Sequence, residues 1–210
     1  MMRLLAAPLA ALAVGAAIQS LPAPLEAELG ARYWHAGCPV PLARLRVLTV
    51  THWGFDGRRH TGQLVVNQSA AAPLRRVFAR LDALRFPIRH LQLADYYGPS
   101  SSIPADRDVS ASFHCRQAVA SPCSGGKKGT GSWSNHAYGL AVDLNPRENP
   151  YVGCGRNRDP ARTPYLDRTR LRPGMVTPAV IEAFRSIGWG WGGSWSGSTR
   201  DYMHFSVNGH

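Results

Sequence analysis

Lysine is almost missing from this 210-residue sequence: Lys127 and Lys128 are the only two, so 22 of its 24 basic side chains are arginines. The chain also lacks a clustered basic run and any recognisable motif for reading bases. Despite a formal net charge of +11, these absences argue against specific nucleic-acid binding. The charge favours acidic partners, among them anionic cell-wall polymers.

The sequence has no apolar run of the about 20 residues that a confident membrane helix requires. Its N-terminal apolar stretch, residues 4–18, is short and rich in alanine, follows Arg3 and precedes small residues up to Ala27. This pattern is typical of a secretory signal. We therefore predict a signal peptide or an uncleaved anchor over residues 1–27, a single domain over residues 28–210, and a secreted or cell-envelope location.

The four cysteines contain no CxxC pair, so their spacing does not resemble a cysteine zinc site. An even number in an exported chain favours two disulfides. Three connectivities are open, and the sequence does not choose among them. A bond between Cys115 and Cys123 would close a short loop and leave Cys38 for Cys154, which is the pairing that we expect.

Hydrophobic periodicity predicts the secondary structure. No internal repeat is visible, and the elements do not alternate as regular βαβ units. This order indicates an α+β domain with a small, mostly antiparallel sheet, flanking helices and long loops. The predicted strands are 45–51, 62–67, 88–97, 140–145 and 202–207, and the predicted helices are 69–85 and 177–187.

Two of these strands each place a polar side chain opposite an apolar face. In the first, Leu140, Val142 and Leu144 point toward the core and Asp143 points away, because neighbouring side chains of a strand alternate. His136 precedes a turn at Gly139 and can fold back toward this carboxylate.

The last strand predicts the third member of the group. Met203, Phe205 and Val207 alternate inward, so His204 faces the other way. Two imidazoles and one carboxylate, with a fourth position for water, form the ligand set of a catalytic zinc site. Asp201 is expected in the turn that leads into this strand, where a carboxylate beside the water can act as a general base.

The same residues resemble a known family. The pattern Ser-x-His-x-x-Gly-x-Ala-x-Asp, from Ser134 to Asp143, followed by Asp201-x-x-His204, is similar to the zinc D-alanyl-D-alanine carboxypeptidases. That family includes phage L-alanyl-D-glutamate endolysins and shares its fold with the hedgehog signalling domain. Further similar stretches are GQLVVN at 62–67, the segment 112–116, Asn149-Pro150-Tyr151, and the Trp/Gly-rich run at 188–193.

The resemblance implies a zinc hydrolase that cleaves peptidoglycan stem peptides, with Zn²⁺ held by His136, Asp143 and His204. We expect the chain to be a monomer. Either a D-alanyl-D-alanine or an L-alanyl-D-glutamate bond is the expected target. A non-catalytic, zinc-containing cell-wall binding module is the alternative, although a structural site needs no base such as Asp201.

Two positions bear on the assigned activity. Arg116 matches the family arginine that faces the substrate, where a guanidinium suits a carboxylate or an oxyanion. The competing interpretation is an ion pair between Arg116 and Asp106 or Asp108. Asp201 stands where the dipeptidase branch of the family has glutamate, which makes a pure dipeptidase less expected.

Overall fold

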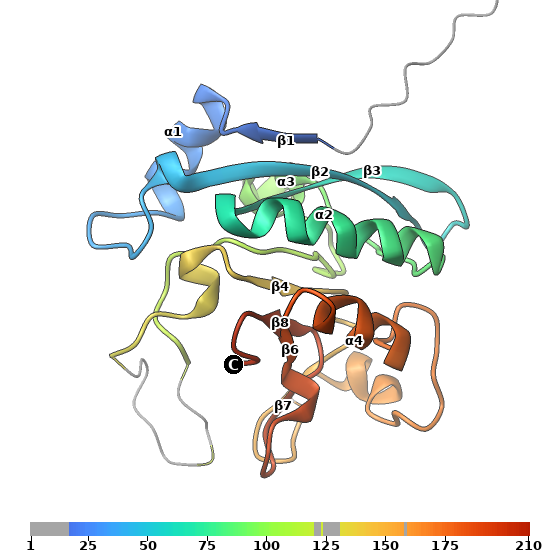
Figure 1. The fold of residues 1–210 in the computed structure, drawn as a ribbon. Coiled ribbons are helices and arrows are strands. Elements are labelled where there is room, and N and C mark those ends of the chain that lie inside the picture. Colours follow the sequence, from blue (N-terminus) through green and yellow to red (C-terminus); the bar gives the residue numbers. More distant parts are fainter. Residues whose placement is uncertain (1–16, 120–122, 124–130, 158) are drawn as a thin grey trace, which may run out of the picture.

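The computed structural model describes residues 17–119, 123, 131–157 and 159–210 (Figure 1). They form an α+β domain whose named strands all pair antiparallel, which confirms the predicted class. The strands divide among three small sheets rather than one, in the orders β1-β2-β3, β4-β8-β6 and β5-β7.

The first sheet is built on a long hairpin. Residue 45 lies opposite residue 67 and residue 53 opposite residue 59, so the β-branched runs predicted as strands pair along their whole length. The bounds of its strands are β1, Ala17–Ser20; β2, Leu45–Trp53; and β3, Arg59–Asn67.

The predicted signal segment lies only partly within the described residues. Residues 1–16 are outside them, while β1 pairs with β2 and is followed by α1, Ala23–Arg32. The signal segment and the domain boundary after residue 27 therefore stay predictions. Within the described ranges, no helix is long and apolar enough to cross a membrane.

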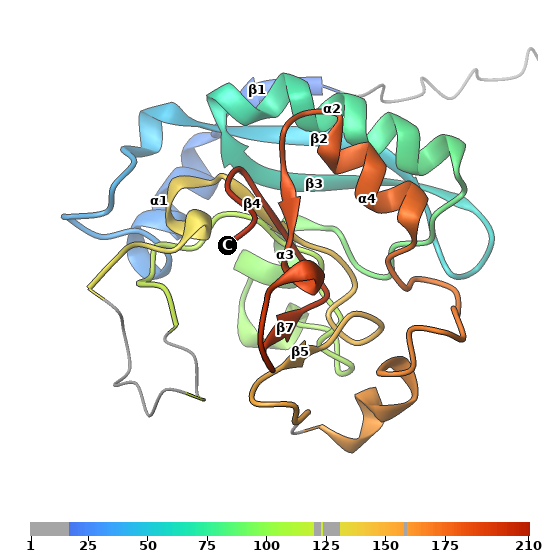
Figure 2. The ribbon, with the colours of Figure 1, turned by 60° about the horizontal axis from the view of Figure 1, so that its bottom comes forward.

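Two helices cover the core and lie side by side (Figure 2). Helix α2, Gln68–Ala83, begins where the Asn67 side chain accepts a hydrogen bond from the Ser69 backbone, at 3.0 Å. Helix α4, Pro178–Arg185, is capped by Thr177, whose hydroxyl accepts from the Val180 backbone. Both helices therefore form over the stretches that their apolar spacing predicts, 69–85 and 177–187.

The second sheet, β4-β8-β6, packs against this core. Val142, Leu144 and Phe205 are fully buried among the apolar residues of α2 and α4. Val207 is 39% exposed and Met203 lies outside the core, so two of the predicted inward positions are wrong. The strand ends at Ser206, and alternation stops there. The bounds are β4, Ala141–Asp143; β6, Gly190–Trp191; and β8, His204–Ser206.

Residues 88–97 do not form the predicted strand. The Asp95 carboxylate accepts the backbone hydrogen bond of Gln92, at 3.2 Å, and this local contact begins helix α3, Leu93–Tyr97. The remaining elements are two short strands, β5, Tyr151–Val152, and β7, Arg200–Asp201, and 3₁₀ turns at Leu42–Arg44, Ser100–Ser102, Asn135–Tyr138, Pro160–Tyr165 and Gly192–Ser194.

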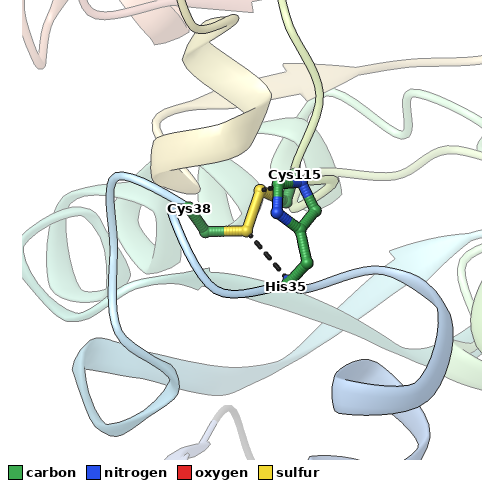
Figure 3. A group of neighbouring side chains, drawn as sticks. All are labelled: His35, Cys38 and Cys115. Atoms are coloured by element: carbon green, nitrogen blue, oxygen red, sulfur yellow. Dashed lines mark hydrogen bonds between the residues drawn. A yellow bond between two sulfur atoms is a disulfide. The ribbon is translucent and has the colours of Figure 1, made fainter.

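The expected disulfide pairing is wrong, although two disulfides are present. Cys38 is bonded to Cys115, and Cys123 to Cys154, with Cα atoms 5.9 and 5.1 Å apart. The Cys115 backbone donates to the Tyr33 carbonyl at 3.0 Å, so the entry segment runs beside residue 115 and brings Cys38 to it. His35 lies next to this disulfide (Figure 3). Because both sulfurs are used in the bond, this His/Cys group is not a metal site.

Candidate metal centre

His136 is positioned by a single 3₁₀ turn. The Ser134 hydroxyl accepts the backbone hydrogen bond of His136, at 3.3 Å, and so supports the site as a cap. Gly139 ends the turn in the left-handed conformation, with φ of 65°, and β4 begins two residues later. The turn therefore folds His136 back toward Asp143, as the sequence predicts.

Gly139 also lies against the first sheet, and this contact gives a prediction. A Cβ at residue 139 would be 2.6 Å from the backbone nitrogen of Asn67. A Cβ at Gly188, where φ is 83°, would meet nothing within 4 Å. Both alanine variants incur the left-handed penalty of about 1–2 kcal/mol. Gly139→Ala should lose a further 1 kcal/mol or so, in the range of about 1–3 kcal/mol typical of overpacking. Denaturant unfolding of both variants measures the difference, and equal losses would contradict the close packing.

The sheet register places Asp143 directly opposite His204 in the β4–β8 pair, so both side chains share one face. His204 Nδ1 is 3.1 Å from Asp143 Oδ1 and 3.3 Å from His136 Nε2. His136 Nε2 is in turn 3.3 Å from Asp143 Oδ2. The structure thus brings the three predicted ligand residues together, with one ligand atom of each within 4.8 Å of the others.

These separations fit a zinc ion. Nitrogen and oxygen ligands lie about 2.0–2.2 Å from zinc, so tetrahedral neighbours are about 3.3–3.6 Å apart. The His136 tautomer fits as well, because its Nδ1 is 2.5 Å from the Ser112 carbonyl and must donate there. Its Nε2 lone pair then faces the Asp143 carboxylate, and two such acceptors are stabilised by a cation between them.

The charge of Asp143 is maintained by its neighbours. Burial alone would raise the pKa of Asp143, but the nearby imidazoles of His136 and His204 outweigh it and hold the pKa below the usual range. A carboxylate that stays ionised is ready to bind a metal cation across the working pH range.

Asp201 lies in the same cavity as the three ligand residues. It is the second residue of β7 and pairs with Tyr151, so it belongs to a short strand rather than to the predicted turn. Its Oδ1 atom is buried and has no hydrogen-bond partner among the described residues. Burial, and next the charge of Asp143, raise the pKa of Asp201 to about 7. A carboxyl with this pKa can take up and release a proton near neutral pH.

Arg116 does not form the ion pair that was its alternative interpretation. Arg89 binds Asp108 instead, with Nε 2.9 Å from Oδ2, and lies 3.9 Å from Asp106. The only hydrogen bond of the Arg116 side chain within the described residues is a long one to the Gln117 carbonyl, at 3.4 Å. Its guanidinium therefore remains available to a substrate.

Two cavities open onto the metal centre, and both are lined by Arg116, His136 and Asp143. The larger cavity has a volume of about 820 Å³. Its lining includes the third ligand residue, His204, and also Asp201, Trp133 and Trp195. The smaller, of about 370 Å³, has a different polar lining, which includes Tyr33, Tyr96, Arg107 and His114.

The sequence marks the segment 112–116 only through the family resemblance, and it assigns no role to three supporting groups, Ser112, His114 and Tyr96. Ser112 orients His136 through its backbone carbonyl, which any residue type supplies. His114 and Tyr96 meet in the smaller cavity, with Nδ1 and the hydroxyl oxygen 2.9 Å apart. Burial lowers the pKa of His114 to about 4 and raises that of Tyr96 to about 12, so both stay neutral. The alternation around Phe113, which is fully buried, was the available signal.

Comparison with protein-family models gives a match to part of the chain. The model of the D-alanyl-D-alanine carboxypeptidase family matches residues 128–207, the part of the chain that carries His136, Asp143, Asp201 and His204. This finding supports the resemblance noted from the sequence and, at the level of the family, a peptidase acting on peptidoglycan. With the two disulfides it indicates an extracytoplasmic protein. The curated proteins and the solved structures yielded no significant match.

Proposed function

Since the metal-centre segment matches the D-alanyl-D-alanine carboxypeptidase model, we propose that the chain is a zinc metallopeptidase of the cell envelope. Its substrates are peptidoglycan stem peptides, cleaved at a D-alanyl-D-alanine or an L-alanyl-D-glutamate bond. The observation that carries the proposal is the group of two imidazoles and one carboxylate beside Asp201, a second carboxylate that is not part of the ligand set.

The ligand residues proposed for zinc are His136 through Nε2, His204 through Nδ1, and Asp143 through its carboxylate. When bound, zinc activates a water molecule and polarises the peptide carbonyl. Because a structural site of the same composition needs no adjacent base, Asp201 favours a catalytic role over a purely structural one.

The residues of the chain then account for the proton transfers. Asp201 takes the proton of the attacking water and passes it to the nitrogen of the leaving amine, so the carboxylate is regenerated in each cycle. Arg116 stabilises the negative charge that develops on the carbonyl oxygen. The raised pKa of Asp201 suits both halves of this transfer.

The monomeric state of the protein and its contact with anionic wall polymers also belong to the proposal. The net charge of +11 suits a protein that works as a monomer among anionic wall polymers. A non-catalytic wall-binding module with a structural zinc ion would share this charge and these ligands. The two functions differ in turnover, which one experiment measures.

That experiment is mass spectrometry of defined muropeptides after incubation with the zinc-loaded protein, with and without a chelator. We expect a chelator-sensitive loss of one D-alanine or a cut after L-alanine, and the product identifies the bond. Bound zinc with no product from any stem length would reject the peptidase in favour of the binding module.

A further inference from the structure

The smaller cavity beside the metal centre carries hydrogen-bond donors in excess. Two guanidiniums, those of Arg107 and Arg116, line it, and neither forms an ion pair within the described part of the chain. Of the two acids in its lining, Asp95 accepts from the Gln92 backbone through Oδ2, and Asp143 belongs to the metal centre. The two guanidiniums supply several N–H donors on the cavity wall, and such donors are complementary to an anionic carboxylate.

His114 supplies a further donor with a fixed orientation. Its only side-chain hydrogen bond among the described residues joins Nδ1 to the Tyr96 hydroxyl, which has no other partner there. The phenol is the more acidic of the two groups and a neutral ring nitrogen is the stronger acceptor. We therefore assign the hydroxyl as the donor to Nδ1, so that the neutral ring carries its proton on Nε2.

The surrounding structure holds this pair in place. The Tyr33 hydroxyl donates to the Tyr96 carbonyl at 2.6 Å, and the His114 backbone donates to the His136 carbonyl at 3.1 Å. The second bond ties His114 to a proposed zinc ligand. The adjacent Cys115 is held by its disulfide to Cys38. The donor is thus built into the same framework as the metal centre.

We propose that His114 is a specificity-determining residue, whose Nε2–H binds the carboxylate on the leaving residue of the stem peptide. This inference rests on the proposed function. Both candidate bonds fit it, because the carbon that bears the leaving nitrogen also bears a free carboxylate in each case. In D-alanine this group is the chain terminus, and in D-glutamate it is the α-carboxyl, since the stem continues through the side chain.

The test measures binding without turnover, by calorimetry of zinc-loaded protein in an Asp201→Ala background. The first pair of probes is a stem pentapeptide ending in D-alanine and its C-terminal amide. The second pair carries D-glutamate with a free or an amidated α-carboxyl. The free acid of the recognised pair should bind about 10–100-fold more tightly than its amide. The pair of probes that differs in affinity identifies which carboxylate His114 binds.

Two substitutions at residue 114 separate binding from structure. In His114→Asn the short amide can still accept from Tyr96 but does not reach the Nε2 position, so the free acid should bind about tenfold more weakly and the amide unchanged. In His114→Gln the longer amide restores a donor there, and binding of the acid should recover to within about threefold of the His114 protein.

Each outcome decides the inference. Equal affinity of acid and amide for the His114 protein, equal weakening of both probes in His114→Asn, or no binding of any probe would overturn it. Turnover by the protein with Asp201 intact but without preference for the acid would keep the proposed function and reject this inference. An acid preference without turnover would show that His114 binds a carboxylate but would reject the peptidase, and with it the role of His114 in the specificity of cleavage.

Discussion

Replacing Asp201 with alanine should reduce kcat on stem peptides by about 10²–10⁴-fold, the usual contribution of a general base. The loss follows because Asp143, the other acidic side chain among the described residues of the cavity lining, is part of the ligand group. Zinc content should stay near one ion per chain, since Asp201 is not a ligand. The measurement is steady-state kinetics together with metal analysis of the same preparation.

The control for this prediction is Asp167→Ala. Asp167 is half exposed and bonds only its own loop, so its loss should leave kcat and zinc content unchanged. Unchanged turnover in the Asp201 variant would show that the base lies elsewhere, and loss of zinc would show that Asp201 supports the metal rather than the reaction.

Replacing Asp143 with alanine should, unlike the Asp201 substitution, cause loss of the bound zinc. The anionic ligand that contacts both imidazoles would be gone. Loss of groups that only support a ligand weakens metal binding about 10–100-fold, so removal of a ligand should cost more. Competition with a chromophoric chelator measures the zinc affinity.

Asp143 and Asp201 serve as matched controls for each other, because both are carboxylates in one cavity. We expect Asp143→Ala to lose zinc and turnover together, and Asp201→Ala to lose turnover alone. If Asp143→Ala bound zinc with native affinity, the assigned ligand set would be wrong.

Much of the fold follows from local sequence signals. The β-branched runs at 45–51 and 62–67 and the capped, amphipathic helices at 69–85 and 177–187 form where periodicity places them. These elements need only local alternation and a cap to be recognised. The antiparallel hairpin and the α+β class follow from their order.

The errors arise where distant or local polar contacts decide the structure. Residues 93–97 look apolar enough for a strand. The Asp95 carboxylate instead accepts a hydrogen bond from the Gln92 backbone, and a helix begins there. The disulfide pairing depends on the path of the entry segment past residue 115, which spacing does not encode. Alternation predicts Val207 inside only for a strand that continues past Ser206, and β8 ends there.

Most of the metal site could be predicted from the sequence, because two of its ligand residues are close to each other along the chain. His136 and Asp143 are joined by one turn and one strand, and alternation alone puts Asp143 and His204 on polar faces. The register that sets them opposite each other is a tertiary property. So is the contact between His114 and Tyr96, which lie on separate segments and meet only in the fold.

Anomalous diffraction at the zinc edge, from crystals of the zinc-loaded protein, tests the central claim most directly. The account predicts one strong peak, at about 2.0–2.2 Å from His136 Nε2, His204 Nδ1 and an Asp143 oxygen. Asp201 should lie beside the ion without binding it. No peak at this position, or a peak for which Asp201 replaces one of the three ligands, would contradict the account.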